Sequence, residues 1–242
     1  KDSMVGYYQM STVDAEKAGI ARPGYVEELG YVPGSEMYRQ EVLGEFVWWA
    51  GLVFEQGWKM PDPFIVPTLS PVVGGIDFGQ ISPSAITVIG WDAQGALWDI
   101  DEFYKARCDF GDLLSAAARM QRHHGVLMFY ADNANPELIA TMRKGGLRVT
   151  ACKKRPEIAT SWINTLIKQG RYHLSPACHF SRMELESYQY KENLSGDEHA
   201  FTDKVKAGQA DHLINAKQYA ALGLGQMRPR RDVNMYVTGS FR

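Results

Sequence analysis

The sequence predicts an α/β domain built on a mixed β-sheet, in which an antiparallel meander is followed by parallel strands and helices cover both faces. Two observations support this prediction. Residues 73–104 contain three apolar or β-branched runs separated by short turns, as a meander requires. Residues 110–169 then alternate amphipathic stretches with short apolar runs, a pattern typical of strands that are covered by helices on both faces.

The individual elements follow from hydrophobic periodicity and from turn residues. The meander strands are expected at 73–78, 85–91 and 96–104, with a turn at 92–95. The next elements alternate as helix, strand, helix, strand and helix, at residues 110–123, 126–131, 136–144, 147–152 and 158–169. Pro136 suits the first turn of its helix, where no backbone N–H is needed. A last helix is expected from Asp211.

Composition divides the chain into three regions. Residues 1–73 are rich in proline and loops, with one clear helical stretch at 35–44, and we expect them to be a linker or the end of a larger part, packed on or leading into the next domain. Residues 74–225 form the predicted α/β domain, with a hairpin within 186–206. Residues 226–242 form a basic tail without periodicity.

Charge and cysteine content exclude several classes of protein. The net charge of the 242 residues is −2, so any nucleic-acid surface must come from local clusters of basic residues. Three scattered cysteines are too few for a disulfide framework or a zinc site and favour a reducing compartment. No apolar run has the length of a membrane span, and the first residues do not resemble a signal peptide.

Three aspartates lie at the ends of predicted elements and carry most of the functional information. Asp77 closes the first strand, Asp132 ends the run 126–131, and Asp211 opens the last helix. Each of them alone has a plain structural explanation as a turn residue or a helix cap. Together they suggest a cluster, and clustered carboxylates need a cation to neutralise them. Oxygen ligands of this kind favour Mg²⁺ or Mn²⁺.

The sequence around these aspartates is similar to a known family. Residues 75–79, 131–137 and 211–220 resemble the three acidic motifs of the nuclease domain of tailed-phage large terminase subunits. The resemblance covers roughly residues 74–222, and residues 38–46 resemble the segment that joins the packaging ATPase to the nuclease. The sequence contains no phosphate-binding loop of the Gly-x-x-x-x-Gly-Lys-[Ser/Thr] type, so the ATPase motor itself is expected to be absent.

The resemblance implies an RNase H-like fold and a metal-dependent DNA endonuclease. Such a domain cuts concatemeric double-stranded DNA at the start and end of packaging, with little intrinsic sequence specificity. Its partners in the full-length protein would be the ATPase motor domain, the portal protein and the small terminase subunit. It would act in the host cytoplasm, at the portal of the procapsid.

Phosphodiester hydrolysis explains why aspartates are needed. Two metal ions about 3.5–4 Å apart can activate a water and stabilise the phosphoryl and leaving oxygens. We expect Asp77 to bridge two Mg²⁺ or Mn²⁺ ions, with Asp132 holding one and Asp211 the other. Many members of the family carry a further aspartate where this chain has Asn215, which could orient a ligand or a water. His199 and His212 lie near the third motif and are auxiliary candidates.

Two groups of basic residues are candidates for contact with DNA phosphates. The first group follows the strand predicted at 147–152, and the second flanks the predicted hairpin. Neutralisation of phosphates by such residues gives affinity that does not depend on sequence. Each residue could equally be part of a solvated surface. The two groups are Lys153, Lys154 and Arg155, and Lys191, Lys204 and Lys206.

Two other functions were weighed. An actin-like phosphotransferase or ATPase domain also uses an aspartate near glycine, but it needs a second glycine-rich phosphate segment and an adenosine-binding motif, and neither is found in the sequence. A non-catalytic docking module of the packaging motor would have no use for a complete acidic trio. The sequence therefore favours an endodeoxyribonuclease.

Overall fold

The computed structural model describes residues 10–28, 42–44, 51–79, 82–192 and 201–227. Several sequence predictions fall outside these residues, and nothing is concluded about them. They are most of the helix expected at 35–44, the turn of the hairpin, His199 and nearly all of the tail.

The chain forms two compact units, residues 1–51 and residues 52–242. The first unit contains the short helices α1 (Thr12–Lys17) and α2 (Tyr25–Glu28). Helix α1 begins with a capping box, in which Ser11 and Asp14 satisfy each other's backbone N–H groups. The second unit contains the sheet and every site residue discussed below.

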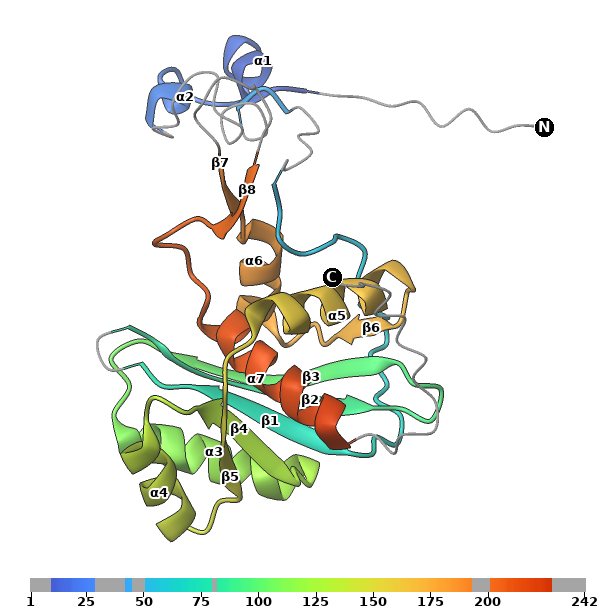
Figure 1. Cartoon of the computed structure of the whole chain (residues 1–242). Helices are drawn as coiled ribbons and strands as arrows, with labels where there is room; N and C mark the ends of the chain where they lie inside the picture. Colours follow the sequence, from blue (N-terminus) through green and yellow to red (C-terminus); the bar gives the residue numbers. More distant parts are fainter. Residues whose placement is uncertain (1–9, 29–41, 45–50, 80–81, 193–200, 228–242) are drawn as a thin grey trace, which may run out of the picture. The chain divides into compact units, whose positions relative to one another are not determined.

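The second unit is built on a six-stranded mixed sheet with the order β5-β4-β1-β2-β3-β6 (Figure 1). Strands β1, β2 and β3 form the predicted antiparallel meander, and β4 and β5 continue parallel to β1 on its other side. The predicted mixed sheet is therefore confirmed. The five predicted strands are β1 (Val72–Asp77), β2 (Ser84–Trp91), β3 (Leu97–Lys105), β4 (Met128–Asp132) and β5 (Val149–Cys152).

Helices cover both faces of this sheet, as predicted. Helices α3 (Phe110–His124) and α4 (Pro136–Lys144) pack on one face, where Met120 and Ile139 meet Ile76 of β1 and Phe129 of β4 in a buried cluster. Helices α5 (Pro156–Lys168) and α7 (His212–Met227) pack on the opposite face. None of the helices within the described residues is long and apolar enough to cross a membrane.

Two elements have no counterpart in the sequence predictions. Strand β6 (Tyr172–Leu174) adds to the β3 edge of the sheet, and α6 (His179–Ser187) follows it. Strand β6 has only three residues, and α6 leaves Phe180 and Met183 exposed, so neither gives a clear periodic pattern. The two strands of the predicted hairpin are present as β7 (Tyr190–Glu192) and β8 (Phe201–Val205).

Helix α7 lies directly on the central strands because two glycines leave room for it. A Cβ atom on Gly75 of β1 would stand 1.8 Å from the carbonyl oxygen of Ala216 in α7. A Cβ atom on Gly223 of α7 would stand 2.2 Å from the ring of Tyr130 in β4. Both distances are far inside van der Waals contact, so neither position has space for a side chain. This close packing places the start of α7 near the ends of β1 and β4.

Candidate functional site

Asp77 and Asp132 lie side by side at the ends of neighbouring parallel strands. Ile76 of β1 is paired with Ala131 of β4, so the next residues, Asp77 and Asp132, are also neighbours across the two strands. Adjacent strands are about 4.8 Å apart. Because successive side chains alternate between the faces of a sheet, both aspartates point to the face opposite buried Ile76, which is the face that α7 covers.

Asp211 and His212 approach the same place from α7. Asp211 directly precedes the helix, and its carbonyl accepts a hydrogen bond from Asn215 N–H at 2.8 Å. His212 is the first helical residue, and its Nδ1 lies 3.0 Å from Asp77 Oδ2. This hydrogen bond raises the pKa of His212, and the nearby Asp77, Asp211 and Glu184 carboxylates raise it further against the opposing effect of burial. The imidazole therefore links the third motif to the first.

Each of the other two aspartates also has its own hydroxyl partner. Burial raises the pKa of Tyr219 far above its ordinary value, and the carboxylates of Asp132 and Asp77, with a hydrogen bond to Asp132, add to the rise. Burial likewise raises the pKa of Tyr188 to about 12, and Asp211 contributes by its charge and by a hydrogen bond. All three aspartates thus have a donor supplied by α7 or by the end of α6.

Glu184 of α6 holds the N-terminus of α7. Its Oε2 accepts the backbone N–H of Ile214 at 2.9 Å, and its side chain is buried. A carboxylate at this position satisfies an unpaired N–H of the first turn and interacts favourably with the helix dipole. Burial raises the pKa of Glu184 to about 7, although the backbone hydrogen bond and the nearby His212 and Lys217 act in the opposite direction.

Asn215 is buried one turn into α7, and its Oδ1 accepts a hydrogen bond from Lys154 Nζ at 2.7 Å. Lys154 belongs to the loop between β5 and α5, together with Lys153 and Arg155, and this contact ties the first basic group to the helix that carries the third motif. The second basic group lies elsewhere, on and just after the two-stranded β7–β8 sheet, with exposed side chains: Lys191, Lys204 and Lys206.

Among the residues that the structure describes, no group of three or more His, Cys, Asp or Glu side chains is arranged to hold one metal ion. The donor chemistry nevertheless fits Mg²⁺ or Mn²⁺, because Asp77 and Asp132 present hard carboxylate oxygens on one face beside Asp211. Mg²⁺ is usually held by only one or two carboxylates, with waters and substrate phosphates completing its coordination. The predicted assignment, in which Asp77 is shared and each ion takes one further aspartate, asks no more than this.

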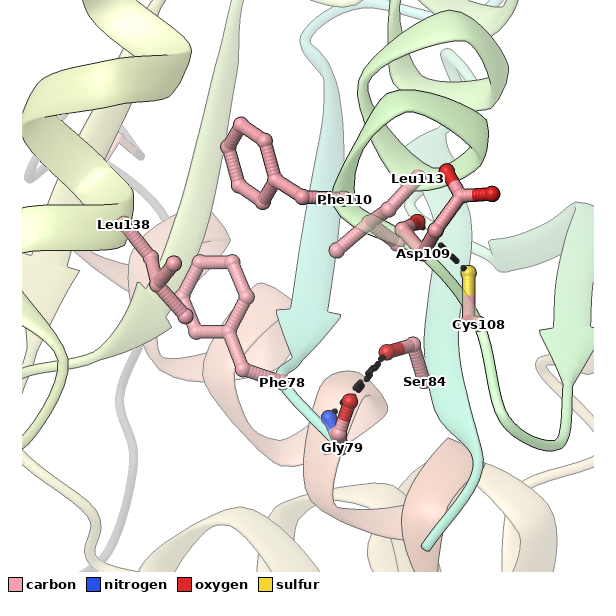
Figure 2. Close-up of a pocket in the computed structure, with 8 residues that line it drawn as sticks. All are labelled: Phe78, Gly79, Ser84, Cys108, Asp109, Phe110, Leu113 and Leu138. Carbon is pink, nitrogen blue, oxygen red and sulfur yellow. Dashed lines mark hydrogen bonds between the residues drawn. The ribbon is translucent and has the colours of Figure 1, made fainter. Parts of the chain in front are cut away.

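A separate cavity of about 260 Å³ lies just beyond Asp77, lined by Phe78, Gly79, Ser84 and Cys108 among others (Figure 2). Ser84 Oγ donates to the carbonyl oxygen of Gly79 and closes the loop between β1 and β2. Phe78 packs against the cluster under α3 and α4, whereas Asp77 points to the α7 face. The cavity is therefore not the carboxylate site.

Solved structures with this fold are nuclease parts of phage large terminases. The g2p large terminase nuclease domain of bacteriophage SPP1, solved with bound Mn, superposes with a TM-score of 0.57 at 18% identity, covering 71% of this chain and 97% of that chain. The P22 large terminase nuclease domain gives 0.53 at 15%, covering 69% and 91%. The large terminase of a thermophilic bacteriophage gives 0.58 at 15%, covering 84% and 53%, so this chain spans about half of that protein.

These comparisons establish the fold. The chain has the RNase H-like mixed α/β fold of large terminase nuclease domains, as the sequence predicts. The chain matches no protein-family model, and no curated protein matches it.

Sequence reasoning did not identify Tyr219, Glu184 or the hydrogen-bonding role of Tyr188. Tyr219 had a detectable signal, because it follows Asp211 and Asn215 at four-residue intervals and so shares their helix face. Glu184 had none, because α6 itself was not predicted.

Proposed function

We propose that this chain is the nuclease part of a phage DNA-packaging terminase and acts as a metal-dependent DNA endonuclease. The observation that supports this most strongly is the meeting of three acidic motifs, far apart in the sequence, around one end of the sheet in the fold of terminase nuclease domains. The nuclease is assigned to residues 74–225. Its substrate would be concatemeric double-stranded DNA, cut when packaging starts and ends, with little sequence specificity of its own.

The site residues take distinct roles in this proposal. Asp77 and Asp132 present carboxylate oxygens from adjacent strands, and Asp211 adds a third from the start of α7. Divalent ions bound there, Mg²⁺ or Mn²⁺ and two in number, would activate the attacking water and neutralise charge on the phosphoryl and leaving oxygens. His212 holds Asp77 by its Oδ2 atom and fixes the orientation of the carboxylate. Asn215 orients Lys154.

The basic residues would neutralise DNA phosphates on either side of the cut. Lys154 is the best placed, because its contact with Asn215 brings its ammonium group to the face of α7 that follows Asp211. Lys153 and Arg155 extend the same loop, and Lys191, Lys204 and Lys206 offer a second contact at the β7–β8 sheet. In the assembled motor, the ATPase domain, portal protein and small terminase subunit would set the place of cutting, in the cytoplasm of the host.

A plasmid-nicking assay tests the proposal. We expect relaxed and linear products with Mg²⁺ or Mn²⁺, none with EDTA, and a loss of at least about 100-fold in the Asp77→Asn, Asp132→Asn and Asp211→Asn variants. Combining the three changes should cost little more than one, since residues that act as a unit fail together. Asp101→Asn is a matched control, because Asp101 also binds a histidine, His124, at 2.8 Å but belongs to β3 and none of the three motifs. Full activity of Asp77→Asn would refute the assignment.

A further inference from the structure

A buried ion pair beneath α7 has no part in the chemistry proposed above. Lys217 of α7 binds Asp99 of β3, and their side chains are 1% and 0% exposed. Asp99 also accepts hydrogen bonds from Tyr172 of β6 and Thr87 of β2, both at 2.9 Å. Lys217 donates a further hydrogen bond to Ser181 of α6 at 3.3 Å. One pair of charges therefore joins α7 to three strands and to α6.

Stability alone does not explain why such a pair is present. Removing two charges from water costs about as much as their attraction returns, and apolar residues of similar volume often stabilise a protein as well or better. What an ion pair adds is direction. The ammonium group must meet the Asp99 oxygens and Ser181 Oγ together, so it permits one position of α7 along the sheet, whereas apolar side chains tolerate sliding.

The position of α7 determines the geometry of the carboxylate site. A shift of the helix by one residue would move its start by about 1.5 Å and turn it by about 100°. Either movement would carry His212 away from Asp77 Oδ2, to which it is bound at 3.0 Å, and Asp211 would move with it. Metal sites and catalytic groups tolerate displacements of only about 0.5 Å. Lys217 lies little more than one turn beyond His212 on the same rigid helix.

Glu184 provides a second anchor at the helix start. It binds the backbone N–H of Ile214 from α6, and α6 also supplies Ser181 to Lys217. The two anchors therefore share one supporting helix. The N-terminus of α6 is itself fixed to β3, because both carboxylate oxygens of Glu102 accept backbone N–H groups, from Phe180 and Ser181, at 2.8 Å.

We propose that Asp99 and Lys217, assisted by Glu184, are positioning residues that fix α7 on the sheet and thereby hold Asp211 and His212 against Asp77. The proposal rests on the nuclease function proposed above, because it assigns these residues to the same carboxylate site.

The test replaces the ion pair by neutral groups of similar size in Asp99→Asn/Lys217→Met. The matched control is Glu55→Gln/Lys168→Met, which removes an ion pair of 3.0 Å between side chains that are 45% and 64% exposed. The first readout is the imidazole ¹⁵N shift of His212 in EDTA, assigned by its loss in His212→Gln. The second is Mn²⁺ affinity, and the third separates kcat from KM in plasmid cleavage.

We expect the buried-pair variant to remain folded and to lose the His212 shift characteristic of the bond to Asp77. Its Mn²⁺ affinity and kcat should fall about 10- to 100-fold, the usual cost of removing a residue that orients metal ligands. KM for DNA should change less than kcat, because the basic loops are untouched. The control variant should match the wild type in all three readouts.

Wild-type His212 shifts and Mn²⁺ affinity in a folded Asp99→Asn/Lys217→Met variant would overturn the proposal. If that variant does not fold, Thr87→Val decides, since it removes only one hydrogen bond to Asp99 at nearly constant volume. A changed His212 signal in Thr87→Val supports the positioning role, and an unchanged one refutes it. The NMR readout needs neither metal nor DNA, so a wild type that fails to cut DNA would refute the proposed function without deciding this inference.

Discussion

Replacing Asp77 by asparagine should have two effects that can be separated by metal. Without metal, the variant loses the charged partner of His212, a hydrogen bond of 3.0 Å between side chains that are 16% and 18% exposed. Hydrogen bonds to charged groups contribute about 1.5–3 kcal/mol. Because the pair is partly exposed, we expect about 1 kcal/mol at pH 6, or a decrease of about 2–4 °C in Tm for a unit of this size.

With metal, the difference should be larger. An ion that binds only the folded protein stabilises it by about 2.7 kcal/mol when its concentration is 100 times Kd. This corresponds to an increase of about 5–10 °C in the Tm of the wild type. Asp77→Asn removes the carboxylate that both ions are expected to share, so its Tm should rise much less.

Thermal unfolding of wild type, Asp77→Asn and Asp101→Asn, each in EDTA and in excess Mn²⁺, measures both effects. Asp101→Asn removes the partner of His124, a pair with similar exposures of 23% and 17%, and should lower Tm in EDTA by a comparable amount. It should keep the full increase with Mn²⁺. An Asp77→Asn variant that gains as much from Mn²⁺ as the wild type would refute the reasoning, because Asp77 would then not be a ligand.

Three further predictions concern pH, packing and DNA. In EDTA, the free energy of unfolding should fall as pH rises from about 5 to 8, because the raised pKa values of Glu184 and His212 mean that the folded protein binds their protons more tightly than the unfolded chain; Glu184→Gln should flatten the lower part of this curve in pH-dependent denaturant titrations. Gly75→Ala should prevent α7 from docking against the carbonyl of Ala216, giving a protein with a strongly reduced Tm and no cleavage. Removal of three cations from one basic group should weaken duplex binding equally for all sequences and reduce the salt dependence of log K by up to about 3, as fluorescence anisotropy would show. We expect the larger effect from alanine at Lys153, Lys154 and Arg155, and the smaller from alanine at Lys191, Lys204 and Lys206.

The sheet could be predicted from the sequence because its strands are apolar and bounded by turn residues. The β1 prediction was one residue off at each end, and α4 was predicted at its observed bounds of 136 and 144. Helix α6 could not be found in this way. Two of its large apolar residues, Phe180 and Met183, are exposed, while the polar Ser181 and Glu184 are buried. Hydrophobic periodicity fails when a helix turns polar side chains inward to hold other elements.

The candidate site was predictable in part for a similar reason. Asp77, Asp132 and Asp211 were recognisable because they sit at element ends inside distinctive local motifs. Their neighbours were not, because Tyr188, Tyr219 and His212 have no local sequence signal for the carboxylate that each contacts. Those pairings depend on how α7 lies across the sheet, and they could be read only from the packed structure.

The three aspartates are therefore held in place by different kinds of force. Asp77 and Asp132 are fixed to each other by the backbone pairing of β1 with β4, which does not depend on any one side chain. Asp211 has no such pairing, and its place depends on α7, which is held by two close-packed glycines, by Lys217 and by Glu184. Changes in the support of α7 should therefore displace Asp211 and His212 while Asp77 and Asp132 stay together, so the third motif is where the geometry of the site is most easily altered.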